Sequence, residues 1–158
     1  MRSTVLAAAG LTALGLLAGG HAALASSAGP TQNRGTTLQV VSHDRTNARV
    51  DVGRKGFGAG DEDVSSMTLE VDGQPAGHGT ITCQAMRVSR KSVDEQCSGV
   101  LALTNGSVTF VGLNTSGRGA PPPFDWAVTG GTGSYAGATG FLHVIPGNRT
   151  VHMTLNLL

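Results

Sequence analysis

Residues 128–140 read VTGGTGSYAGATG and carry five glycines in thirteen positions. Glycine has no side chain to pack, so this density indicates positive φ angles or the close approach of another group. Residues 131–136 also match the G-x-G-x-x-G/A pattern of dinucleotide-binding loops. That loop needs a helix directly after it and an acid about 20 positions further on. Gly137 and Gly140 oppose a helix, and Asp125 is the last acid of the chain. We therefore predict a tight turn between two β-strands, with these structural glycines: Gly130, Gly131, Gly133 and Gly140.

The composition favours one all-β domain. The chain has 158 residues, of which 39% are hydrophobic, 13% are charged and 24 are glycines. Many Gly, Val and Thr residues with few charges suit strands better than helices. The formal net charge is +1, and the chain has no large basic cluster. This gives no support for a nucleic-acid partner or an anionic membrane partner.

The N-terminus has the pattern of a secretory signal peptide. Arg2 is followed by an uncharged apolar run over residues 5–20 and by Ala-Leu-Ala at 23–25, which is a cleavage signal. We predict a signal peptide at 1–25, a disordered lead-in at 26–35 and a β-barrel domain at 36–158. The mature protein is expected to be secreted and to have no membrane segment.

Cys83 and Cys97 are the two cysteines of the chain. An even number of cysteines in an exported protein predicts a disulfide. A catalytic thiol is the alternative, but it would need a neighbouring group that lowers its pKa.

Turn signals separate eight short β-rich segments. The first is expected at 36–43, and a glycine-rich stretch at 45–60 is expected to be a mobile loop, either a lid or an ordinary connection. Asn105-Gly106 and Gly147-Asn148 are typical hairpin turns. The other clear strands are expected at 64–71, 77–88, 94–104 and 124–129. This pattern predicts a β-sandwich or a small antiparallel barrel.

Two-residue loops at these turns would set the register of both hairpins. The first would pair Leu103 with Val108 and Leu101 with Phe110, with all four on a core face. The second would place His143 opposite His152. Two imidazoles so placed can bind Zn²⁺ or share a proton, but the simpler interpretation is that both face solvent and bind no metal.

The motifs resemble a known family over about residues 60–158. They comprise Asp72-Gly73, residues 97–101 (CSGVL) and residues 127–140 (AVTGGTGSYAGATG). In this order they are similar to exported bacterial proteins of the allene oxide cyclase barrel-like group, which are relatives of plant dirigent proteins. The resemblance implies a calycin-like, eight-stranded antiparallel β-barrel with an apolar cavity, and often a homotrimer.

The resemblance also implies chemistry without a cofactor. Allene oxide cyclases isomerise an epoxide by confining it, and dirigent proteins orient radicals in a pocket. Dirigent proteins carry arginines at the positions of Ser134, Ala136 and Thr139, so this chain lacks those cationic groups. Fold is a weaker guide to function than the site itself.

Candidate site residues follow from residue type and position. Asp61, Asp63 and Tyr135 are the candidates for catalysis, although acids before a strand commonly face water. Trp126, Tyr135, Phe110 and Phe141 are the candidates for ligand binding, the alternative being that they fill the barrel.

We therefore expect an exported barrel that binds a small apolar molecule. It would be a cofactor-free isomerase or cyclase, or else a non-catalytic carrier or orienting protein. An acid/base enzyme should place a group with a shifted pKa in the cavity, and a carrier need not.

Overall fold

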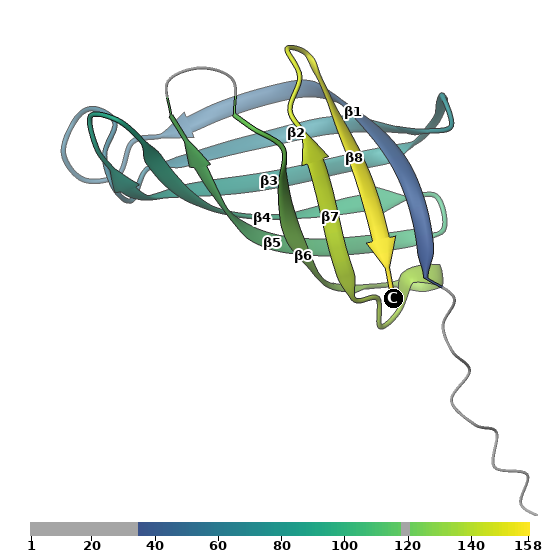
Figure 1. The fold of residues 1–158 in the computed structure, drawn as a ribbon. Helices are drawn as coiled ribbons and strands as arrows, with labels where there is room; N and C mark the ends of the chain where they lie inside the picture. The colour runs from purple at the N-terminus through teal and green to yellow at the C-terminus, as the bar shows by residue number, and fades with distance from the viewer. Residues whose placement is uncertain (1–34, 118–120) are drawn as a thin grey trace, which may run out of the picture. The chain divides into compact units, whose positions relative to one another are not determined.

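The computed structural model describes residues 35–117 and 121–158. These residues form eight strands that pair in chain order and close into an antiparallel barrel (Figure 1), which confirms the predicted fold class. The predicted signal peptide and residues 26–34 of the predicted lead-in lie outside the described residues. The strands are β1 (Thr36–Val50), β2 (Glu62–Val71), β3 (Gln74–Val88), β4 (Val93–Leu103), β5 (Gly106–Ser116), β6 (Phe124–Gly131), β7 (Gly140–Ile145) and β8 (Thr150–Leu157).

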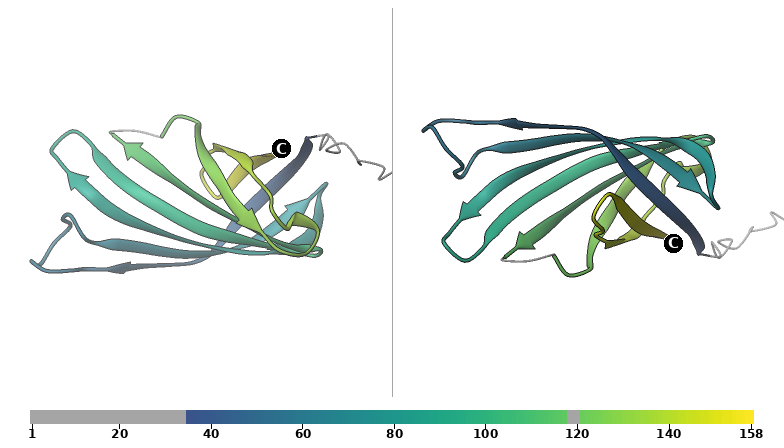
Figure 2. Two further views of the ribbon diagram at one scale, coloured as in Figure 1. Left: turned by 90° about the horizontal axis from the view of Figure 1, so that it is seen from below. Right: turned by 90° about the horizontal axis from the view of Figure 1, so that it is seen from above.

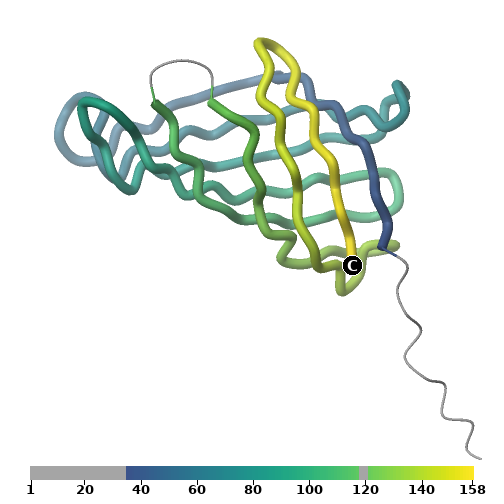
Figure 3. The backbone as a smooth tube through the Cα atoms, in the orientation of Figure 1, coloured from purple at the N-terminus to yellow at the C-terminus, as the bar shows by residue number. Residues whose placement is uncertain are grey.

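The last strand closes the barrel on the first. β8 pairs with β7 on one side and with β1 on the other, and Val40 lies opposite Met153 in the closing ladder. The smooth trace of Figure 3 shows β8 lying between these two neighbours. Closure satisfies the backbone groups that an open sheet would leave unpaired at its edges.

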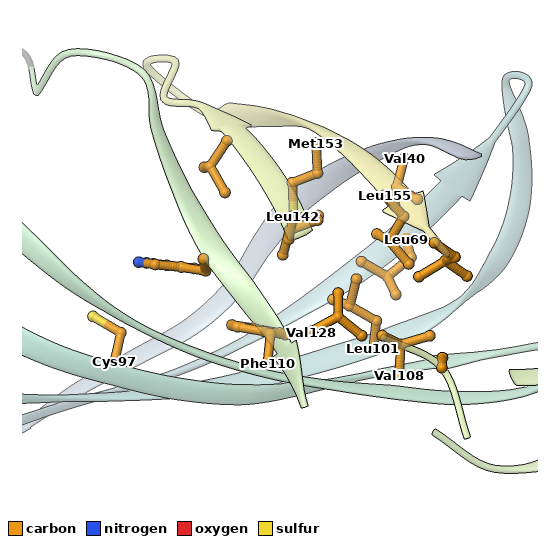
Figure 4. Packing of buried hydrophobic residues seen from close by; sticks show 14 of the residues in the cluster. Val40, Leu69, Cys97, Leu101, Val108, Phe110, Val128, Leu142, Met153 and Leu155 are labelled. Carbon is orange, nitrogen blue, oxygen red and sulfur yellow. The ribbon is translucent and has the colours of Figure 1, made fainter. Parts of the chain in front are cut away.

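The core fills the closed part of the barrel. Alternate residues of a strand point to opposite faces, and those that point inward are large and apolar. Leu69, Leu101 and Leu155 are at most 1% exposed. Figure 4 shows side chains from β1, β7 and β8 pointing toward those from β4 and β5. Their burial is the main source of stability.

The strands differ in length, so one end of the barrel is extended. β1 and β3 have 15 residues each, whereas β7 has 6. The longer strands run past the closed part at the end that carries the β1–β2 and β3–β4 loops (Figure 2). The inner face of this extension is therefore not covered by β7 and β8.

The stretch predicted as a mobile loop at 45–60 begins as strand. β1 continues to Val50 with a bulge between Asp44 and Thr46. Polar side chains pair across to β2 in this part, with Thr46 Oγ1 2.7 Å from Ser66 Oγ and Asn47 Nδ2 donating to Ser65 Oγ at 2.9 Å. Such cross-strand pairs stabilise a strand without an apolar pattern, which is why the sequence did not reveal it.

Both predicted hairpin registers are wrong by two residues. Leu103 pairs with Gly106 and Leu101 with Val108, so the first turn is made by Thr104 and Asn105. Near the second turn, Val144 pairs with Met153. A shift of two keeps every side chain on its predicted face. The predicted core face of the first hairpin is therefore confirmed, because Leu101, Val108 and Phe110 are buried and Leu103 packs against them.

The glycine-rich segment is a turn, as predicted, with one short 3-10 helix, η1 (Gly133–Tyr135). It folds against the β4–β5 turn, where Ser134 N donates to Asn105 O at 2.8 Å. A Cβ on Gly131, Gly133 or Gly140 would come within 2.4 Å of a backbone oxygen. Gly130 differs, because a Cβ there would be 3.5 Å from its nearest neighbour, Thr109 Oγ1.

Cys83 and Cys97 lie directly opposite one another on β3 and β4 and form the predicted disulfide. Within the described part of the chain, no helix combines the length and apolar character of a membrane span.

Candidate functional site

The candidate site is a cavity at the extended end of the barrel. It has a volume of about 220 Å³ and is largely apolar. Pro121, which precedes β6, and Pro146, which follows β7, line its opening. The remaining lining residues are Ser42, Asp44, Ser65, Met67, Ile81, Phe110, Asn114, Phe124, Trp126, Val144, Val151 and Met153.

Three aromatic rings form one wall of this cavity. Phe110 and Trp126 stack with 5.2 Å between ring centroids and 4° between ring planes. Phe124 lies 4.8 Å from Trp126 at 44°. Gly112 makes room for the indole, because a Cβ there would be 1.9 Å from Trp126 Cδ1. Phe110 and Trp126, two of the four aromatic candidates for ligand binding, therefore line the cavity.

Charged side chains lie on the inner face beside the cavity. The bulge at Asp44/Thr46 shifts the alternation of β1, so Arg49 faces the same side as Asp63 of β2. Arg49 donates two hydrogen bonds to Asp63, from Nε at 2.9 Å and from Nη2 at 2.7 Å. Its guanidinium also lies 4.6 Å from the centroid of the Phe57 ring. The Asp63 hydrogen bond and charge raise the pKa of Arg49.

Glu95 of β4 joins this group from the other side of the disulfide. Its neighbours across the strands are Ala85 and Asn114, and Asn114 lines the cavity. Burial raises the pKa of Glu95, and the Asp63 charge raises it further, while Arg49 acts in the opposite direction.

Asp61, a candidate for catalysis, is buried at 1% exposure but does not line the cavity. Its carboxylate accepts hydrogen bonds from Val52 N at 2.8 Å and from Gly58 N at 2.9 Å. These two bonds lower its pKa, so the group remains charged and holds the β1–β2 loop. Asp63, the other acidic candidate, forms an ion pair with Arg49.

Tyr135 and Phe141 lie away from the cavity. Tyr135 belongs to η1 and packs against the core next to Leu38, Val71 and Leu103, which places it among the turns at the other end of the barrel. Phe141 points outward from β7 and is 43% exposed. Its placement corrects the expectation that it lines the interior, because its neighbour Leu142 takes the inward position.

His143 and His152 are on the outer face and are not opposite each other. His143 pairs with Thr154, and His152 pairs with Ile145. His143 Nδ1 is 2.6 Å from Asp125 Oδ1, an exposed contact. Within residues 35–117 and 121–158, no three His, Cys, Asp or Glu side chains gather as a metal site requires.

Sequence reasoning missed most of the polar side chains around the cavity. Asp44 lies just beyond the strand predicted at 36–43. Ser65 lies in the strand predicted at 64–71, where its alternation with Met67 and Leu69 indicates an inward position. Ser42 is 1% exposed, and only its alternation with Val40 pointed to an inward position.

Fold and cavity together define the class of protein. The chain is an eight-stranded antiparallel barrel of the allene oxide cyclase and dirigent type, with a largely apolar cavity at one end. No protein-family model matches the chain, and no curated protein sequence matches it.

Solved structures share the barrel. A pyocyanin demethylase is 27% identical with a TM-score of 0.65, and the match covers 77% of this chain and 99% of that one. A pterocarpan synthase dirigent protein is 15% identical with a TM-score of 0.62, covering 78% and 84%. A Diels-Alderase from Streptomyces koyangensis is 12% identical with a TM-score of 0.56, covering 80% and 71%. The predicted resemblance to this type of barrel is confirmed.

Proposed function

We propose that the protein binds a small, flat, largely apolar molecule in the cavity and holds it in one orientation. The observation that carries this proposal is the stacked pair Phe110 and Trp126 on the wall of a cavity of about 220 Å³. Concave apolar pockets with a few polar groups are typical of small-molecule sites. The likeness to a pyocyanin demethylase, a protein named for a small-molecule substrate, supports the same conclusion.

Fluorescence provides a direct test, because Trp126 is the single tryptophan of the chain and lines the cavity. A bicyclic aromatic compound should change the emission of Trp126 with a saturable dependence on its concentration. Val151→Phe adds bulk to the cavity wall and should weaken binding by about tenfold or more. Val64→Phe is the matched control, because Val64 faces outward on β2 and is 39% exposed.

Two results would contradict the proposal. One is equal affinity of Val151→Phe and the unmodified protein for the same compound. The other is the absence of saturable binding across a panel of flat aromatic compounds and lipids. Native mass spectrometry of protein purified from culture supernatant supplements the test, since a retained small molecule would be weighed directly.

A cofactor-free isomerase or cyclase is the second candidate. It is favoured by the carboxyl group of Glu95, which lies beside the cavity with a raised pKa. Confinement lowers a barrier by holding reacting atoms in place. Chromatography with mass detection distinguishes the two candidates. An isomerase would convert more than one molar equivalent of its ligand to a product of equal mass, whereas a carrier would release the ligand unchanged.

We also propose export and a homotrimer. Export predicts that protein from the culture supernatant begins near Ser26, which N-terminal sequencing would show. The trimer predicts a mass of three chains in light scattering. The broad outer depression over β3–β6, lined by residues such as Thr80, Val100 and Val111, is the surface we expect another copy to cover.

A further inference from the structure

Among the charged side chains beside the cavity, carboxyl groups outnumber guanidinium groups. Asp44 lines the cavity, and Asp63 and Glu95 lie on the inner face next to it. Arg49 is the guanidinium in this group, and it is already engaged by two hydrogen bonds to Asp63 and by the ring of Phe57. Three carboxyl groups therefore share one guanidinium, which gives this side of the opening a negative character.

Within the described residues, two carboxyl groups of this set, those of Asp44 and Glu95, have no hydrogen-bond or ion-pair partner. Burial and the charge of Asp63 raise the pKa of Glu95, and the charge of Arg49 acts in the opposite direction. Ala85, the neighbour of Glu95 on β3, is small and 2% exposed. A half-buried carboxylate beside another carboxylate is poorly solvated. A positively charged group beside Glu95 would stabilise its ionised carboxylate.

An independent observation comes from the cavity wall. Trp126 is 7% exposed, and within the described residues its indole Nε1 has no hydrogen-bond partner. An unpaired buried donor is costly, so a ligand that carries a hydrogen-bond acceptor beside a flat apolar body would suit this wall. The faces of the Trp126 and Phe110 rings also attract cations.

We propose that the cavity binds a flat aromatic cation that also carries a hydrogen-bond acceptor, with Asp44 and Glu95 as its counter-charge and the Phe110–Trp126 pair as its stacking surface. This inference rests on the proposed small-molecule function and adds the charge of the ligand to it.

The test uses three bicyclic probes of similar shape: N-methylquinolinium as the cation, quinoline as the neutral compound and 2-naphthoate as the anion. Trp126 emission at neutral pH reports the binding of each. The unmodified protein should bind the cation about tenfold more tightly than quinoline and should bind 2-naphthoate most weakly.

Glu95→Gln should reduce the preference for the cation severalfold while leaving the affinity for quinoline unchanged, because Asp44 remains in the cavity lining. Glu62→Gln is the matched control, because Glu62 lies on the outer face of β2 and is hydrogen-bonded by Gln84. It should retain the full preference. Raising the salt concentration should reduce the preference in the unmodified protein, which tests the electrostatic origin without any variant.

The outcomes separate the two proposals. Equal binding of N-methylquinolinium and quinoline, or a preference of undiminished size in Glu95→Gln, would overturn the charge inference and leave the cavity function standing. Failure of all three probes to bind would overturn both.

Discussion

Gly112 lies beneath the indole of Trp126, where a Cβ would come within 1.9 Å of Cδ1. Gly112→Ala should therefore displace the indole and lower the free energy of unfolding by about 1–3 kcal/mol. Urea unfolding followed by circular dichroism would measure this change. Gly130→Ala serves as the control, because the nearest atom to its new Cβ is 3.5 Å away. If both variants lost a similar free energy of unfolding, displacement of the Trp126 indole would not be the cause of the loss in Gly112→Ala.

Asp61 shows how a buried charge can serve the backbone alone. Because hydrogen bonds from Val52 N and Gly58 N lower its pKa, its contribution to stability is complete above the ordinary aspartate pKa of about 3.9. That contribution is lost as the pH falls through the lower pKa of the folded state.

Asp61→Asn should consequently lower the melting temperature at neutral pH, and the difference from the unmodified protein should shrink below about pH 4. Thermal unfolding over a pH series would show this trend. Asp125→Asn, which removes an exposed partner of His143, should have little effect. A deficit in Asp61→Asn that stayed constant down to low pH would contradict the role assigned to the charge.

Among the elements, the β3–β4 pair is joined covalently by Cys83 and Cys97, which are separated by 14 positions. Replacing both with alanine should lower the free energy of unfolding by about 3 kcal/mol in the chain-entropy model. Reduction of the unmodified protein should produce a comparable loss. Thiol titration of the unfolded, unreduced protein should find no free thiol, and two reactive thiols would refute the pairing.

β1 illustrates why strand boundaries could not be predicted from the sequence. The apolar residues of its first half include Leu38 and Val40, whereas its second half is mostly polar and is held by pairs such as Arg49–Asp63. A polar strand is stabilised by hydrogen bonds to the neighbouring strand, and no apolar pattern in its own residues marks it as a strand. The bulge after Asp44 then decides which side chains face inward.

At the scale of the whole molecule, the barrel closes through contacts that are remote in the chain. Thr154 donates a hydrogen bond to Gln39 across 115 positions of sequence. Folding must bring these strands together before the core is complete, so we expect refolding in milliseconds to seconds. Stopped-flow measurement of Trp126 emission would test this, and refolding within microseconds would contradict it.

The strand pattern left a sandwich or a barrel open, and the family resemblance favoured the barrel. The residues by themselves determined the all-β class, the turn at residues 128–140, the disulfide and the inward faces of the hairpin strands. These depend on local patterns: strand periodicity, glycine density and cysteine count. The sequence also singled out Phe110 and Trp126 as candidates for ligand binding, but together with Tyr135 and Phe141, which lie away from the cavity, because residue type alone does not say which face of a strand a side chain takes.

Only the tertiary structure decided the register of both hairpins and the surroundings of the cavity. A shift of two residues leaves the apolar pattern unchanged, so no periodicity distinguishes the correct pairing of Leu101 from the wrong one. Arg49 of β1 and Glu95 of β4 face the same side because a bulge shifts the alternation of β1 and the pairings of β2 with β3 and of β3 with β4 carry that face across the sheet. Such proximity between distant polar residues arises from packing and leaves no local signal in the chain.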